Sequence, residues 1–190
     1  MTKYIYLLII ILLTSCQQRF TPKPIGYLRF DFEEKEAKKF EVEDRFFSFQ
    51  TADYFNMTIQ TRNTDYWINL EYPKHNATIH LTHTFIKNNL SNLIEDTRSM
   101  AYKHTIKADA ITEKNYSNPN TNAYGKLYDI KGRTASAVQF YLTDSTKNFL
   151  RGSLYFYCSP NQDSLKPVIN YIREDIITII ETIQWTDDGI

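Results

Sequence analysis

The chain contains very little cysteine, with 2 Cys among its 190 residues. Cys16 directly follows an apolar leader at the N-terminus, which leaves Cys158 without a partner for an intrachain disulfide. A fold that is held together by disulfides is therefore excluded. Cys158 ends an apolar stretch, where a free thiol is most often a small core residue. A reactive thiol is the alternative.

Neither sign of charge is in excess. The sequence has 22 Lys and Arg and 22 Asp and Glu, and loss of the leader removes Lys3 and leaves a net charge of −1. A nucleic-acid surface, which needs a basic stripe, is therefore not expected. Glycine and proline are also scarce, at 5 and 6 residues, whereas 14 Tyr and 12 Phe are present. This composition favours a well-packed, β-rich fold over a disordered chain.

The longest apolar run near the N-terminus is too short to cross a membrane. This run spans nine residues, Ile5 to Leu13, if Tyr6 is counted as apolar. As a helix they would rise about 14 Å, whereas a bilayer core is about 30 Å thick. With Lys3 before it, the run has the size and flanks of the apolar region of a signal peptide. Residues 1–15 are therefore predicted to be a signal peptide.

The tetrapeptide Leu13-Thr14-Ser15-Cys16 resembles the lipobox of bacterial lipoproteins. The resemblance implies that Cys16 receives a thioether-linked diacylglycerol, and that the bond between Ser15 and Cys16 is cut. The new amine of Cys16 is then acylated, for example with palmitate. Several acyl chains, at about 0.8 kcal/mol per methylene, hold a protein on a membrane permanently. The alternative is an apolar leader followed by an incidental cysteine.

Three parts of the chain follow from this pattern. Residues 1–15 are the signal peptide, 16–26 the lipid anchor and a tether stiffened by Pro22 and Pro24, and 27–190 a single α+β domain. The acylated Cys16 would bind membrane lipid and place the domain in the cell envelope, facing the periplasm. Whether the lipid lies in the inner or the outer membrane is left open.

The apolar patterns predict mostly strands with two helices between and after them. Strands are expected at 27–32, 46–49, 54–61, 67–72, 77–85, 108–116, 124–130, 136–143 and 149–158. Helices are expected from Asn88 or Asn89 to about Ile106, and from Asp163 or Ser164 along an isoleucine-rich stripe to Ile183. The charged run 33–39 is read as a solvated helical turn or loop.

This order of elements predicts an α+β fold, a mostly antiparallel sheet with two long helices packed on it. By analogy of element order alone, the fold is similar to the PsbP/Mog1 sandwich. The strands at 67–72 and 77–85 should form a hairpin in which Ile79 and Leu81 face the core and His80 and Thr82 face away. Gly152 lies on the inward face of its strand and leaves room for a bulky neighbour.

No catalytic or metal site is recognisable in the sequence, and no cofactor is expected. The chain has no Gly-x-Ser-x-Gly, no Walker-type loop and no Cys-x-x-Cys. His80 and His83 are three apart on a strand and point to opposite faces. His83 and His104 could meet if the helix covers that face, but hydrogen-bonded core histidines are the favoured interpretation over a metal site. The chain is therefore not expected to be an enzyme.

Three longer blocks, at 22–29, 101–111 and 136–152, carry a family resemblance. With the lipobox and the chain length, they resemble the gliding-motility lipoprotein GldD family of Bacteroidetes. The resemblance implies a membrane-anchored accessory protein that gliding requires, linked to type IX secretion and working beside the membrane protein GldE. It supplies no catalytic residues, and only Cys16 carries over as a site. Five block residues could be fold residues or partner contacts, namely Tyr102, His104, Lys107, Arg151 and Gly152.

Three functions are compatible with these observations. The first is a non-enzymatic lipoprotein that binds a membrane or periplasmic partner. The second is a periplasmic domain that binds or carries a small ligand in a tyrosine-lined pocket. The third and weakest is a hydrolase, which would need an open pocket with two convergent titratable groups.

Overall fold

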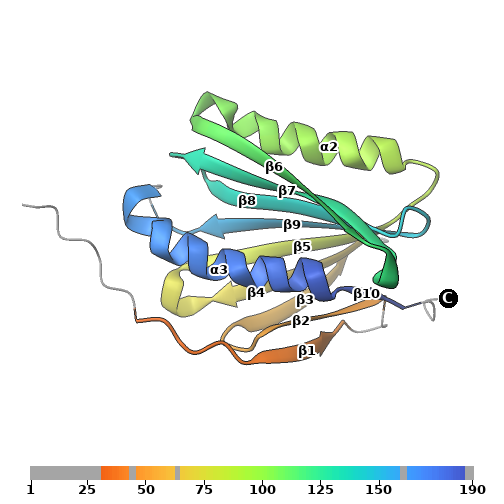
Figure 1. Cartoon of the computed structure of the whole chain (residues 1–190), viewed down its shortest axis with the longest axis horizontal. Helices are drawn as coiled ribbons and strands as arrows, with labels where there is room; N and C mark the ends of the chain where they lie inside the picture. The colour runs from red at the N-terminus through yellow and green to blue at the C-terminus, as the bar shows by residue number, and fades with distance from the viewer. Residues whose placement is uncertain (1–30, 43–45, 63–64, 159–161, 187–190) are drawn as a thin grey trace, which may run out of the picture.

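The computed structural model describes residues 31–42, 46–62, 65–158 and 162–186, which form two sheets and two α-helices (Figure 1). The elements in chain order are β1 (Ala37–Glu41), β2 (Phe47–Ala52), β3 (Asn56–Arg62), β4 (Asp65–Tyr72), η1 (Pro73–His75), β5 (Ala77–Phe85), α2 (Leu90–Tyr102), η2 (Lys103–Ile106), β6 (Ala108–Asn118), η3 (Pro119–Thr121), β7 (Ala123–Gly132), β8 (Ser136–Thr143), β9 (Asn148–Phe156), α3 (Gln162–Thr182) and β10 (Gln184–Trp185). The predicted signal peptide and tether lie outside the described residues.

The large sheet has seven strands in the order β3-β4-β5-β9-β8-β7-β6, and all its pairings are antiparallel. The predicted hairpin of β4 and β5 is confirmed, with Tyr72 opposite Ala77. Its turn passes through Asn76, whose φ of 48° is left-handed, a conformation that asparagine tolerates better than most residues. A second sheet has three strands in the order β1-β2-β10.

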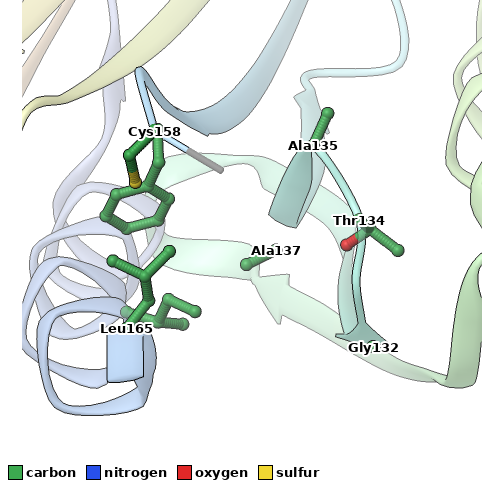
Figure 2. A pocket seen from close by; sticks show the side chains of 8 residues that line it. Gly132, Thr134, Ala135, Ala137, Cys158 and Leu165 are labelled. Atoms are coloured by element: carbon green, nitrogen blue, oxygen red, sulfur yellow. The ribbon is translucent and has the colours of Figure 1, made fainter. Parts of the chain in front are cut away.

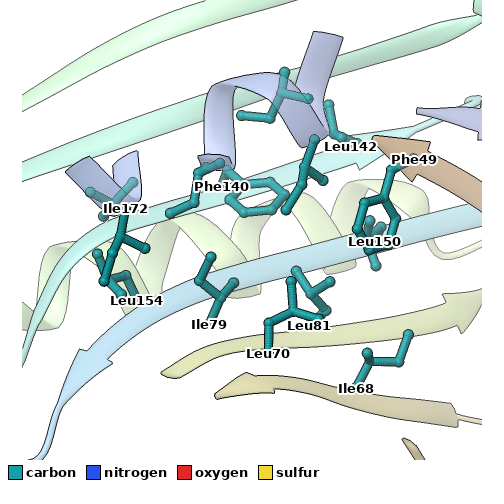
Figure 3. Packing of buried hydrophobic residues seen from close by; sticks show 14 of the residues in the cluster. Phe49, Ile68, Leu70, Ile79, Leu81, Phe140, Leu142, Leu150, Leu154 and Ile172 are labelled. Carbon is teal, nitrogen blue, oxygen red and sulfur yellow. The ribbon is translucent and has the colours of Figure 1, made fainter. Parts of the chain in front are cut away.

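The main core lies between α3 and one face of the large sheet (Figure 3). Alternation along each strand sends one set of side chains to this face, including Ile79 and Leu81 of β5 as predicted. Strand β2 of the small sheet adds Phe47 and Phe49 to the same core. We call this side of the large sheet the α3 face. Further fully buried members of this core come from other strands and from α3, among them Ile68, Leu70, Phe140, Leu142, Leu150, Leu154, Ile172 and Ile176.

Helix α2 lies on the opposite face, behind the strands in the view of Figure 3. Its Ala101 packs with Tyr128 and Ile130 in a second, smaller core cluster. The helix contacts β8 and β9. Trp67 of β4 faces the same side and is 46% exposed, so α2 covers only part of this face. We call the side that carries α2 and Trp67 the open face.

The predicted fold class is confirmed in outline, since the large sheet is antiparallel and two helices pack on it. The helices are of modest length, with 13 residues in α2 and 21 in α3, and α2 is shorter than predicted. Helix α2 ends at Tyr102, and residues 103–106 tighten into a 3-10 turn in place of the predicted α-helix. No periodic pattern distinguishes these two kinds of helix at so short a length.

The small sheet was not predicted, and part of the charged run was read wrongly as a turn or loop. Strand β1 begins at Ala37 and pairs with β2 along its whole length. Its Phe40 stacks on Phe49 and contacts Phe55, while the neighbouring charged side chains stay exposed. Of the strand predicted at 27–32, residues 31 and 32 are not in a strand, and the rest lies outside the described residues.

Candidate binding groove on the open sheet face

An open hollow of about 400 Å³ lies on the open face of the large sheet. Its floor is formed by side chains of β4, β5 and β9, and α2 packs on β9 beside it. We call the polar and aromatic residues that line it the groove. They are Trp67, Asn69, His80, Thr82, Arg151, Ser153 and Tyr155.

Strand register explains why these side chains meet. Trp67 is opposite Thr82, and Thr82 is opposite Arg151, so one row of side chains crosses three strands. The next row along the strands consists of Asn69, His80 and Ser153. Because residues two apart on a strand share a face, both rows point away from α3. The groove is thus built by strands that are remote from one another in sequence.

Arg151 is half-buried in the groove and makes no hydrogen bond or ion pair with any residue that the structure describes. Burial lowers the pKa of its guanidinium, and the nearby Tyr155 phenol opposes that shift more weakly. A charged group that loses water without gaining an opposite charge carries an uncompensated desolvation cost. Arg151 is therefore available to bind an anion.

Two other arginines, unlike Arg151, are paired with carboxylates. Arg173 of α3 donates two hydrogen bonds to the Asp129 carboxylate, at 2.6 and 2.7 Å. Arg98 of α2 donates two to Glu95, at 2.8 and 2.7 Å. The Arg173 pair lines another hollow, of about 440 Å³, where the guanidinium charge is already neutralised. The groove differs because no described residue neutralises the charge of the Arg151 guanidinium.

The groove histidine is held neutral and in one tautomer. Nδ1 of His80 lies 2.7 Å from Oδ1 of Asn69, whose own amide donates to Thr58. Because the Asn69 oxygen can only accept, Nδ1 carries the proton and Nε2 is a bare acceptor. Burial lowers the pKa of His80, and the Glu71 carboxylate raises it by less. At neutral pH the groove thus offers a hydrogen-bond acceptor beside the Arg151 donors.

Ser153 lies directly opposite His80, an arrangement that invites comparison with a hydrolase nucleophile and its base. The geometry does not support that chemistry. No hydrogen bond joins the Ser153 hydroxyl to His80 in the described part of the chain, and Ser153 is only 4% exposed. The strands on both sides of β5 and β9 are paired with them, so the ladder uses the local backbone N–H groups. The groove has the composition of a binding surface.

A second feature fastens the first described residues to the α3 face. The ring of Phe32 stacks on Tyr171 at 4.4 Å, and the Tyr171 hydroxyl donates to the carbonyl of Glu33 at 2.9 Å. The ammonium of Lys35 lies 3.0 Å from the Asp175 carboxylate, and 4.2 Å above the Tyr171 ring. We call these contacts the tether clamp. They lie across the large sheet from the groove.

Asp175 is the buried centre of the tether clamp. Its carboxylate is 2% exposed and accepts a hydrogen bond of 2.5 Å from the Tyr54 hydroxyl. Burial raises the pKa of Asp175, and the bonds from Tyr54 and Lys35 lower it by less. Burial raises the pKa of Tyr54, and the hydrogen bond to the Asp175 carboxylate raises it further. Lys35 therefore stabilises a carboxylate that the surrounding core would otherwise disfavour.

With this geometry established, comparison with known proteins identifies the family. The model of the family described as gliding motility lipoprotein GldD matches residues 17–185. The chain belongs to this family. The resemblance inferred from the three sequence blocks is thus confirmed. GldD lipoproteins are named for gliding motility and for lipid attachment, which makes this GldD chain a membrane-anchored protein of the cell envelope.

A comparison of this GldD chain with curated proteins gives no match. Among solved structures, it is similar to the solution structure of cyanobacterial PsbP (CyanoP) from Synechocystis sp. PCC 6803. The identity is 9% and the TM-score 0.46, over 86% of this chain and 99% of that chain. The PsbP/Mog1 analogy stays a prediction. Within the described ranges, no helix combines the length and the apolar composition that crossing a bilayer requires.

The predicted anchor residues of the GldD chain, Ser15 and Cys16, lie outside the described residues, so lipid attachment at Cys16 stays a prediction. Of the five block residues, Arg151 alone enters the groove, and Gly152 serves packing, since Phe140 lies directly against it. Trp67 and Tyr155 were missed as site residues. Alternation along their strands carried the signal, but the sheet order was needed to bring them together.

His83 and His104, whose meeting the sequence left open as an alternative, do not meet. His83 is fully buried on the α3 face, where Nε2 lies 2.9 Å from Oδ1 of Asn148 and burial lowers its pKa. His104 lies in η2 beside β6, and its side chain has no hydrogen-bond partner in the described part. Three strands separate β5 from β6, or about 19 Å at the usual strand spacing. The core-histidine interpretation holds for His83 only.

Cys158 is exposed, so its interpretation as a core thiol is wrong. Strand β9 ends at Phe156, and Cys158 lies in the bend that follows. It lines a small pocket of about 90 Å³, with Cys158 and Leu165 on one side and Gly132 and Thr134 on the other (Figure 2). No charged side chain lines this pocket, and no group of three metal-ligating side chains gathers in the described ranges.

Proposed function

We propose that this lipoprotein is a non-enzymatic accessory component of the gliding machinery, linked to type IX secretion. In this proposal, acylated Cys16 holds the chain on a membrane with its folded part in the periplasm. The groove then binds a partner protein of that machinery. The observation that carries the proposal is the half-buried Arg151, which has no counter-charge among the described residues, beside the exposed Trp67.

The residue types of the groove support protein binding. Trp, Tyr and Arg are the side chains most enriched at the energetic centres of protein interfaces. Trp67, Tyr155 and Arg151 place one of each in a single hollow. The absence of a Ser153–His80 hydrogen bond supports a role without catalysis.

The tether clamp supports a fixed presentation of the groove. Phe32 and Lys35 bind the chain to the α3 face, so an anchor at Cys16 would pull on the side of the sheet that lacks the groove. The open face is then free to meet a partner. A membrane protein such as GldE, which the family resemblance suggests, is our proposed partner.

A periplasmic small-ligand carrier is the second candidate. The volume of the groove, about 400 Å³, lies within the range of small-molecule sites. Such sites enclose most of the ligand surface, however, and Trp67 at 46% exposure shows that the groove is open. Native mass spectrometry of the lipoprotein distinguishes the two, because a carrier retains a stoichiometric small molecule.

The test of the proposed function is a gene deletion scored for single-cell gliding and for secretion of a type IX cargo. The deletion is complemented with wild type, with Cys16→Ala and with Ser153→Ala. We expect rescue by wild type and by Ser153→Ala, and no rescue by Cys16→Ala. Normal gliding and secretion in the deletion strain would contradict the proposal, and failure of Ser153→Ala despite normal folding would favour the hydrolase.

A further inference from the structure

We infer that the groove receives an acidic side chain, aspartate or glutamate, carried on an extended segment of a partner protein. The carboxylate pairs with Arg151, and an apolar neighbour on the same segment packs on Trp67. This inference rests on the proposed function and names the chemistry of its partner.

The sign of the charge follows from what surrounds Arg151. On the open face, the acidic side chains of β4 are Asp65 and Glu71, which lie two and four residues along the strand from Trp67, the β4 member of the Arg151 row. Neither carboxylate forms an ion pair or a hydrogen bond with Arg151. The guanidinium can therefore accept a carboxylate from outside, and its planar fork matches that group with two parallel hydrogen bonds.

The other groove atoms favour a peptide over a free anion. Nε2 of His80 is a bare acceptor in the row next to Arg151, and the Cα atoms of such diagonal neighbours lie about 7–8 Å apart. An acceptor repels a second carboxylate or phosphate oxygen but binds an N–H group. An extended segment supplies both partners, a carboxylate for Arg151 and a backbone N–H for His80. A lipid phosphodiester, which has no O–H group at neutral pH, supplies only the first.

The position of the groove favours a protein over a lipid surface. The tether clamp holds residues 32–35 against α3, on the opposite side of the large sheet. The described part of the chain therefore begins on the side of the sheet that lacks the groove. The floor strands β4, β5 and β9 are each paired on both sides, so no backbone group is free to extend the sheet. Recognition here depends on side chains, as in an interface centre.

The first experiment locates the occupant in gliding cells. A photo-crosslinking amino acid replaces Gln60, which lies opposite Trp67 and leaves the groove side chains intact. The matched control places it at Tyr157, an aromatic residue that is 69% exposed and outside the groove. We expect a crosslinked partner peptide with an Asp or Glu close to the crosslink, from position 60 only. Crosslinks to lipid, or the same products from both positions, would overturn the inference.

The second experiment tests the charge. The crosslinked peptide is synthesised with its acidic residue and with the matching amide, and each is titrated against the full lipoprotein in nanodiscs. We expect the acidic peptide to bind about tenfold to a hundredfold more tightly, as charge-assisted hydrogen bonds do. Arg151→Gln should reduce its affinity to that of the amide peptide, which the substitution leaves unchanged. Arg133→Gln, at an exposed arginine outside the groove, is the control and should change neither.

Folding effects are separated by two further measurements. Removing an uncompensated charge should leave the melting temperature of Arg151→Gln equal to or above wild type, and Arg151→Lys should retain part of the preference for the acidic peptide. Equal binding of acidic and amide peptides by wild type would overturn the inference. In cells, a deletion that glides normally refutes the proposed function, whereas a gliding defect in the deletion that Arg151→Gln fully rescues refutes this inference alone.

Discussion

At the scale of single residues, the side chain that faces position 152 requires a glycine there. It lies opposite Phe140 of β8 and opposite Leu81 of β5. A Cβ atom at position 152 would come within 2.1 Å of Cε1 of Phe140, whose ring is fully buried. The glycine is therefore required by packing, while its neighbour Arg151 points to the other face and is free to serve the groove.

Gly152→Ala is expected to destabilise the fold by about 1–3 kcal/mol, the usual cost of overpacking a core. Denaturant unfolding measures the change. The control is Phe140→Leu combined with Gly152→Ala, because a smaller side chain at 140 makes space for the new methyl group. The double variant should lose less than the sum of the two single losses. Additive losses would show that the contact with Phe140 is not the cause.

At the scale of elements, the tether clamp attaches an irregular segment to a helix through one buried carboxylate. Lys35 has 25% of its side chain exposed and Asp175 only 3%, so solvent screens this ion pair only from the lysine side. Removing Lys35 leaves a buried carboxylate that keeps the Tyr54 hydrogen bond but has lost its counter-charge. The segment would also lose its cation–π contact with Tyr171.

Lys35→Met is expected to cost about 1–2 kcal/mol at about pH 8, less than a fully buried pair because Lys35 is partly exposed. The pKa of Asp175 is already raised in the folded state, and the substitution raises it further. A group with a raised folded pKa loses its contribution to stability as pH rises through that value, so the deficit should shrink at about pH 5.

Urea unfolding at both pH values tests this prediction. Lys38→Met is the matched control, because Lys38 pairs with Asp53 on the surface, where the two side chains are 56% and 43% exposed. That control should change stability by less than about 0.5 kcal/mol at either pH. A deficit of Lys35→Met that is independent of pH would show that packing, and not the carboxylate, holds the segment.

At the scale of the whole molecule, the two faces of the large sheet are unequally buried. The α3 face carries the main core, which joins α3, the large sheet and β2. The open face has only the small cluster around Ala101, and α2 buries just Thr97 and Ala101 completely. Regions with few buried apolar contacts open at lower free energy than the rest of a protein. Helix α2 is therefore the more easily opened of the two helices.

Amide hydrogen exchange should show faster exchange in α2 than in the middle of α3. Ala101→Gly removes a buried methyl group and a strong helix former, so it should speed exchange in α2 and leave α3 unchanged. Ile176→Val, in the main core, is the comparison and should lower protection in both sheets and α3 together. Equal protection of the two helices in wild type would refute the idea that α2 opens separately.

The features that the sequence predicted well depend on short-range patterns. The alternation of Ile79 and Leu81 with His80 and Thr82 indicated β5, its two faces and its hairpin with β4. The isoleucine stripe indicated α3, and Gly152 indicated a close neighbour. The errors fall where pattern is weak or partners are distant. Strand β1 is a charged segment that becomes a strand only because β2 pairs with it, and Cys158 follows a strand that ends two residues earlier than its apolar run suggested.

The sequence by itself determined the anchor prediction, the family, the α+β class and the facing of most strands, because each depends on residues that are close along the chain. Tertiary structure alone decided that β4, β5 and β9 are neighbours, and hence that Trp67, His80 and Arg151 share one groove. It also decided that, within the described ranges, no carboxylate pairs with Arg151, whereas Lys35 and Arg173 each have one. Whether a charge is neutralised depends on three-dimensional distances between residues far apart in sequence, which no local pattern contains.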